Sequence, residues 1–145
     1  MAVTAARKTF ERDGKQFSHP VEEAVVIHKG SMVGLNAAGY AVPVTEATGI
    51  TAVGMAEESV DNTSGADGAV NVTIRYGTFK WTNGATTDAI TRAEIGDAAY
   101  GVDNSTVSDV ATGRSIVGVI VDVDADGGIW VEHRPGHRAA LTDAT

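Results

Sequence analysis

The chain has 145 residues, no cysteine, 43% hydrophobic residues and a formal net charge of −8. This length suits one domain with its own core, and the composition excludes disordered and membrane proteins. The missing thiols exclude disulfides, thiolate metal sites and cysteine nucleophiles. No apolar run approaches the roughly 18 residues that a membrane-spanning helix needs. The charged N-terminus lacks an apolar stretch, so we expect no secretory signal and synthesis in the cytoplasm.

Charge is unevenly distributed along the chain. Residues 1–20 hold four bases against two acids, whereas residues 21–132 hold sixteen acids against five bases. Binding of nucleic acid requires Lys and Arg to neutralise phosphates, so the acidic body argues against that partner. Basic ends on an acidic body are typical of arms that reach an acidic protein surface, with solvated termini as the alternative. We predict an N-terminal arm, a β-domain and a flexible C-terminal tail, over residues 1–20, 21–133 and 134–145.

Short strands dominate the predicted elements. Apolar residues alternate over short stretches that clusters of Gly, Asn, Asp and Ser interrupt, which is typical of many short strands. One short helix is predicted over residues 88–95, where Thr87 or Asp88 would cap the first turn and Gly96 would end the last. In chain order, the predicted strands are 23–28, 32–35, 40–44, 51–57, 69–76, 78–81, 98–102, 106–108, 116–122 and 128–133.

Two parts of the sequence echo each other. Gly30 opens a pattern of strand, tight turn, strand and loop that leads to a Val-Gly strand at Gly54, and Gly96 opens a similar pattern that leads to Gly118. Each unit is followed by one further strand. Two such units side by side predict an all-β fold, either a small pseudo-symmetric β-barrel or a β-clip or tulip-like sandwich. Chance similarity between Gly- and Val-rich strands is the alternative.

Motifs of enzymatic or metal chemistry are weak. Asp122, Asp124, Asp126 and Gly127 match the first half of a calcium-binding loop, but His133 stands where such a loop needs a bidentate Glu. An acidic turn between two strands is the preferred interpretation. Serines have no adjacent His, and neighbouring carboxylates on a strand point to opposite faces. We therefore expect no enzyme, no cofactor, and no catalytic, cofactor-binding or metal-binding residue.

The aromatic residues permit two interpretations. Tyr76, Phe79 and Trp81 lie on one stretch, and Phe79 and Trp81 share a strand face. That pattern favours a core or an interface over an exposed carbohydrate platform. In the arm, Phe10 and Phe17 stand among charges, so each is expected to be buried against its own barrel or against a neighbouring molecule.

A resemblance to a known family is carried by residues 34–43, 53–62, 65–69, 75–79, 95–100 and 128–131. In these segments the chain resembles the capsid cement or head decoration proteins of tailed bacteriophages. The resemblance implies a structural protein on the outer capsid surface of the virion. Such a protein binds the major capsid protein and stabilises the shell by bridging its subunits. It also implies self-association, with a homotrimer favoured over a dimer, and no contact with nucleic acid or membrane.

The same resemblance assigns shell contact to the N-terminal arm, as in the lambda-type decoration protein. The candidate contact residues are then Arg7, Lys8, Phe10, Arg12 and Phe17. Two other functions remain open. One is a receptor- or glycan-binding β-module on a virion surface, which would need an exposed stretch from Tyr76 to Trp81. The other is a small β-barrel enzyme with its site completed at an oligomer interface and a metal held by the acidic loop.

Overall fold

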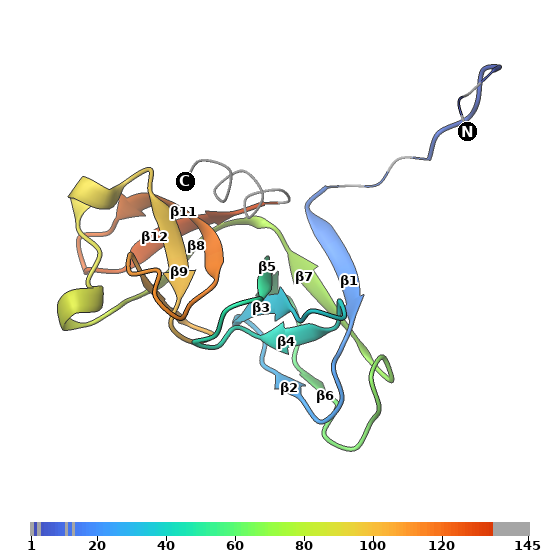
Figure 1. Ribbon diagram of the computed structural model, residues 1–145, viewed down its shortest axis with the longest axis horizontal. Helices are drawn as coiled ribbons and strands as arrows, with labels where there is room; N and C mark the ends of the chain where they lie inside the picture. Colours follow the sequence, from blue (N-terminus) through green and yellow to red (C-terminus); the bar gives the residue numbers. More distant parts are fainter. Residues whose placement is uncertain (1, 3, 11, 13, 135–145) are drawn as a thin grey trace.

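The fold consists of short β-strands arranged as two lobes (Figure 1). The computed structural model describes residues 2, 4–10, 12 and 14–134. Its elements are β1 (Gln16–Pro20), β2 (Val26–Ile27), β3 (Met32–Leu35), β4 (Ala41–Pro43), β5 (Thr51–Ala56), β6 (Val60–Asp61), β7 (Asn71–Arg75), β8 (Gly77–Asn83), the 3-10 turns η1 (Thr86–Asp88) and η2 (Arg92–Glu94), β9 (Ala98–Gly101), β10 (Thr106–Ser108), β11 (Ile116–Val123) and β12 (Ile129–His133). The prediction of an all-β fold is confirmed.

The first lobe is a five-stranded antiparallel sheet with the strand order β1-β7-β5-β3-β4. Its two outer strands meet just after β1 ends. There Val21 forms a parallel bridge with Ala41, and the Glu22 N–H donates to the Ala41 carbonyl at 3.0 Å. The two edges of the sheet therefore meet at this bridge, which gives the first lobe a barrel-like curvature.

The second lobe is a closed five-stranded barrel with the order β10-β8-β12-β11-β9. Parallel pairing of β10 with β8 closes it. Two main-chain hydrogen bonds span this closure, from the Thr82 N–H to the Ser105 carbonyl and from the Gly84 N–H to the Val107 carbonyl, both at 2.9 Å.

The two lobes share one topology. Strands β3, β4, β5 and β7 correspond to β9, β10, β11 and β12, and β1 corresponds to β8, because the neighbours match at every step of the two strand orders. The hydrogen bonds match as well. The Gly30 N–H donates to the Ala56 carbonyl and the Gly96 N–H to the Ile120 carbonyl, both at 2.8 Å. The internal repeat predicted from the sequence is therefore present in the fold.

A glycine stands at the same point of each repeat. Gly54 on β5 and Gly118 on β11 lie so close to the next strand that a Cβ would collide with the carbonyl oxygen of Arg75 or of Glu132, respectively. The pairing register also shifts beside each glycine, between β3 and β5 and between β9 and β11, at a β-bulge or similar irregularity. Glycine is required at both positions because the neighbouring backbone leaves no room for a side chain.

Two apolar clusters fill the lobes. The cluster of the first lobe comes entirely from that lobe: Val21, Ile27, Val33, Ala41, Val53, Ala56, Val72 and Ile74. The cluster of the second lobe also takes in four residues of the first, Met32, Val42, Val44 and Ile50, beside Trp81, Ile90, Ala99, Val107, Val117, Ile120, Ile129 and Val131. The two lobes therefore share core residues.

The short helix predicted over residues 88–95 takes the form of 3-10 turns, not of one continuous helix. Two separate 3-10 turns stand there, because Asn83 takes the main-chain groups of Ile90: its side chain accepts from the Ile90 N–H at 2.8 Å and donates to the Ile90 carbonyl at 2.9 Å. A new turn then begins at Thr91, where the side chain of Glu94 completes a capping box.

The N-terminal boundary also differs from the prediction. Residues 16–20, expected within the arm, form β1 and pair with β7 over five residues. The arm proper therefore ends before Gln16. The other predicted strands are present: β3 and β10 have the predicted bounds, β8 and β11 are longer than predicted, and the rest are shorter. The short strand β6 was not expected. The predicted flexible tail lies outside the described residues from residue 135 onward.

Candidate functional site

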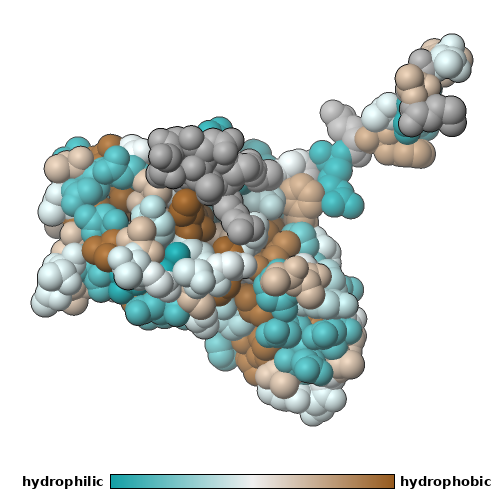
Figure 2. Space-filling model, viewed as in Figure 1, coloured by the Kyte–Doolittle hydropathy of each residue, from teal (hydrophilic) through white to brown (hydrophobic). Residues whose placement is uncertain are grey.

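The candidate contact residues belong to a segment that leads away from the first lobe (Figure 1). Its described residues before β1 are exposed and form neither helix nor strand. Figure 2 shows the far end of this segment standing clear of both lobes. Phe10 has 84% of its surface exposed, the highest value among the exposed large hydrophobic residues. The Phe10 ring is therefore not packed against either lobe.

Two cation–aromatic pairs organise the segment. The Lys8 ammonium lies 5.7 Å from the centre of the Phe10 ring, and the Arg12 guanidinium lies 5.2 Å from the centre of the Phe17 ring. Such contacts place a cation over the face of an aromatic ring. Arg7 is exposed in the same segment. The structure thus brings the candidates together as two pairs, one on the arm and one at its junction with β1.

Phe17 differs from the other candidates because it belongs to the barrel. It is half-buried against the core of the first lobe, and its ring meets Tyr76 edge-on at 5.3 Å. This packing anchors the start of β1, so Phe17 positions Arg12 and is not itself a free anchor. A groove of about 380 Å³ beside the pair is lined by Arg12, Gln16, Phe17, Ser18 and Thr73.

His19 lies next to this groove on β1. Burial, and secondly the positive charge of Arg12, lower the pKa of His19 below its ordinary value of 6.5. Its Nε2 atom is buried without a hydrogen-bond partner in the described part of the chain. The neutral ring is therefore the favoured form in the folded protein, and the positive charge at this site comes from Arg12.

The aromatic stretch of β8 is mostly turned inward. Trp81 is 6% exposed, and its Nε1–H donates to Nε2 of His133 at 2.8 Å. His133 is 2% exposed and its Nδ1 lies 2.7 Å from the Val117 carbonyl oxygen, so Nδ1 carries the hydrogen and Nε2 accepts. Phe79 meets Trp81 edge-on, with ring centres 6.4 Å apart. Of the two interpretations of this stretch, the core interpretation is confirmed for Trp81.

The acidic loop between β11 and β12 is engaged in ion pairs. Lys80 contacts both Asp124 and Asp126, and Arg92 contacts Asp122 at 3.1 Å. The hydrogen bond from Lys80 is the main reason why the pKa of Asp126 is lowered. Within residues 14–134 and the other described positions, no group of three or more His, Asp or Glu side chains is placed to hold a metal ion. The loop is built as a salt-bridged turn, and His133 of the calcium-loop pattern is buried elsewhere.

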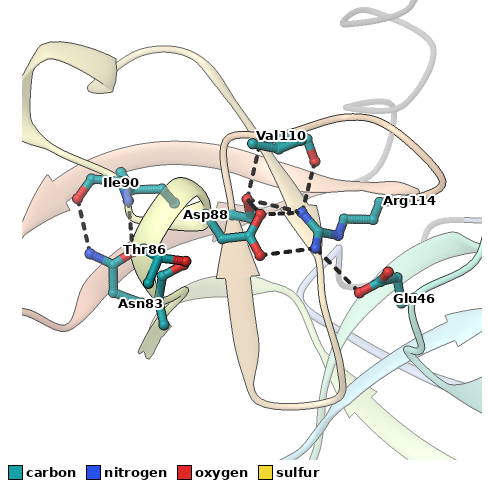
Figure 3. Close-up of polar contacts among 9 residues, drawn as sticks. Glu46, Asn83, Thr86, Asp88, Ile90, Val110 and Arg114 are labelled. Carbon is teal, nitrogen blue, oxygen red and sulfur yellow. Dashed lines mark hydrogen bonds and ion pairs between the residues drawn. The ribbon is translucent and has the colours of Figure 1, made fainter.

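A polar network that sequence reasoning missed lies between the lobes (Figure 3). The Arg114 side chain is 9% exposed and donates to both carboxylate oxygens of Asp88, at 2.7 and 3.1 Å, and to Glu46 at 3.2 Å. It also reaches the Ser108 hydroxyl at 3.2 Å. This guanidinium ties η1 and the loop after β10 to a loop of the first lobe. Its only sequence signal is a lone arginine within a long acidic stretch.

Comparison of the chain with protein-family models, with characterised proteins and with solved structures finds no match. No helix within the described residues has the length and apolar character needed to cross a membrane.

Proposed function

We propose that this chain is a non-enzymatic structural protein of a tailed-phage virion. In this role it binds the outer surface of the capsid and bridges subunits of the major capsid protein. The arm ahead of β1 makes the first contact through Arg7, Lys8, Phe10 and Arg12, with Phe17 as the anchor that holds Arg12 in place. The resemblance described from the sequence motivates the role, and the arm supplies a contact surface for it.

The observation that carries the proposal is the exposure of Phe10. A Phe side chain contributes roughly 1.5–3 kcal/mol when it moves from water into an apolar site. At 84% exposure nearly all of that free energy is still available for a partner. A single Phe10 contact is weak. A capsid offers the same site at every symmetry-equivalent position, so an oligomer that binds several of these sites at once binds strongly.

Charge supports an acidic contact surface on the shell. The arm carries the cations Arg7, Lys8 and Arg12, whereas the described body is dominated by carboxylates. Attraction between exposed charges is screened by salt over a Debye length of about 8–10 Å. Binding through the arm is therefore expected to weaken as the ionic strength rises.

The alternative functions have less support. A glycan-binding module would need the stretch from Tyr76 to Trp81 as a platform, but Trp81 is buried and its indole N–H is already bonded to His133. An enzyme with a metal in the acidic loop would need carboxylates that Lys80 and Arg92 currently engage.

The test is co-sedimentation of the purified protein with expanded, undecorated heads of the cognate phage. The full-length chain is expected to pellet with the heads at a saturable ratio, and a chain that begins at Lys15 is expected to bind much more weakly. Truncation before Lys15 keeps β1 intact, because the Lys15 carbonyl accepts the Tyr76 N–H at 2.8 Å. Absence of pelleting by the folded full-length protein would overturn the proposal.

Point variants locate the contact. Phe10→Ala is expected to reduce head affinity by about tenfold or more. Val121→Ala is the matched control, because Val121 is an exposed aliphatic residue on β11 of the second lobe. In the same way Lys8→Ala is compared with Lys29→Ala, which removes an exposed lysine of the body. Equal losses of head affinity in the arm and body variants would indicate that the interface lies on the two lobes and not on the arm.

A further inference from the structure

Asn83 is the asparagine of this chain that a glycine follows, whereas the other four precede Ala, Thr, Val or Ser. Asparagine before glycine is the pair most prone to spontaneous deamidation, because glycine has no side chain to hinder attack by its main-chain nitrogen. In that reaction the Gly84 nitrogen bonds to Cγ of Asn83 and gives up its proton. The side-chain amide takes that proton and leaves as ammonia, and a cyclic succinimide forms. Water then opens the ring to aspartate or isoaspartate.

Packing explains why these two residues stand together. The Asn83 side chain accepts from the Ile90 N–H at 2.8 Å and donates to the Ile90 carbonyl at 2.9 Å (Figure 3). A carboxamide is suited to this role because it offers an acceptor and a donor side by side. Gly84 is needed because a Cβ at that position would collide with Cβ and the carbonyl oxygen of Asp88. The fold therefore places a chemically labile pair at the end of β8.

The closed second lobe also restrains the reacting groups. The Gly84 N–H donates to the Val107 carbonyl at 2.9 Å, so the attacking nitrogen is engaged. Ile90 holds both polar atoms of the Asn83 carboxamide. Asn83 is the last residue of β8, and the extended backbone of a strand turns the next nitrogen away from the side-chain carbon that it must attack. Opening of the closure between β8 and β10 would release these restraints.

We propose that Asn83 is a gated deamidation site, which reacts when the closure between β8 and β10 opens and is protected while it is shut. The change is one-way. The carboxylate that forms has no N–H to donate, so two acceptors would face each other across the 2.9 Å to the Ile90 carbonyl. Isoaspartate also lengthens the main chain where Asn83 pairs with Val107. A lobe that has opened and reacted therefore closes less firmly than before.

The site does not depend on capsid binding and is tested on the purified full-length chain. The protein is incubated at mildly alkaline pH, either folded in buffer or unfolded in guanidinium chloride, and deamidation is mapped on peptides by mass spectrometry. In the unfolded chain Asn83 is expected to react fastest of the asparagines. In the folded protein its rate is expected to fall by about a hundredfold or more, because reaction must wait for local opening. Equal rates in the two states, or another asparagine reacting first in the unfolded chain, would overturn the proposal.

Arg114→Gln tests the gate without changing the reacting pair. Arg114 holds the carboxylate of Asp88, whose carbonyl oxygen lies against Gly84, so this variant is expected to raise the rate in the folded protein about threefold or more. Arg75→Gln, which removes an exposed ion pair with Glu57 on the first lobe, is the matched control and is expected to react like the wild type. Circular dichroism verifies that both variants fold. A wild-type rate in Arg114→Gln would overturn the gating.

Asn83→Asp reproduces the direct product of the reaction. Because a buried acceptor is left without a donor, this variant is expected to melt about 2–12 °C below the wild type. Asn71→Asp adds the same charge at an exposed strand position of the first lobe and is expected to melt within about 2 °C of the wild type. Equal melting temperatures of Asn83→Asp and the wild type would contradict a weakened closure.

Discussion

The hydrogen bond between Trp81 and His133 gives the sharpest prediction for the fold. Trp81→Phe keeps an aromatic ring in the second lobe but removes the N–H that lies 2.8 Å from Nε2 of His133. Since His133 is 2% exposed, water cannot replace the lost donor without entering the core. An unsatisfied buried acceptor costs about 1–3 kcal/mol, and the smaller ring leaves a cavity that costs about 1 kcal/mol more.

The expected total is a loss of about 2–4 kcal/mol in the free energy of unfolding, a large part of the roughly 5–15 kcal/mol available to a typical domain. For a chain of this size each kcal/mol lowers the melting temperature by about 2–4 °C. Trp81→Phe is therefore expected to melt about 4–16 °C below the wild type in a circular dichroism scan at neutral pH.

Trp130→Phe is the matched control. Trp130 is only partly buried, and its Nε1–H donates to the partly exposed Asp124 at 3.3 Å. Water can replace that donor, so the expected loss is below about 1 kcal/mol. Equal losses in the two variants would refute the argument, because they would show that the buried histidine acceptor has no special cost. Slow hydrogen exchange of the Trp81 indole N–H, followed by NMR, is an independent check.

Three further perturbations probe other parts of the molecule. Gly118→Ala forces a methyl group against the neighbouring strand and is expected to destabilise the fold by about 1–3 kcal/mol in urea titration; an unchanged midpoint would contradict the close approach. Arg114→Gln is expected to lower the melting temperature by about 3–6 °C, and Arg92→Gln, an exposed ion pair, by less than about 2 °C; a reversed order would contradict the role of the buried network. The pKa of His19 is lowered, so the stability that this residue contributes is complete above its ordinary value near 6.5 and is lost as the pH falls through the lowered pKa. Arg12→Gln is expected to raise the pKa of His19 in an NMR titration, and an unchanged titration would show that burial alone is responsible.

Local pattern predicted most of the fold. Strands β3 and β10 have the predicted bounds because clear turn residues flank short apolar runs. The repeat was visible because glycines are required at fixed points of each unit, where backbones approach closely. Strand β1 was missed because its inward residues Phe17 and His19 are separated by polar ones and preceded by charges, which hide the alternation. Strand β1 pairs with β7, whose residues are more than fifty positions away in the sequence, and a local sequence pattern cannot predict such a pairing.

The candidate site was predictable only in part. Composition identified the cationic arm and its aromatic residues, but the anchoring of Phe17 by Tyr76 depends on the long-range packing of β1. The helix expected over 88–95 is divided into two 3-10 turns because one side chain, that of Asn83, competes for main-chain groups. The Arg114 network joins Glu46, Asp88 and Ser108 from three separate segments. Only the folded topology brings such residues together.

The shared core has a consequence for synthesis. All buried residues of the first apolar cluster lie between Val21 and Ile74. The first lobe can therefore begin to fold while the rest of the chain is still being synthesised. Met32, Val42, Val44 and Ile50, however, find their partners only in the second lobe. Until residues up to about Val131 have left the ribosome, these four side chains remain an exposed apolar surface on the nascent chain. During this interval a chaperone that binds these four side chains would protect the nascent chain from aggregation.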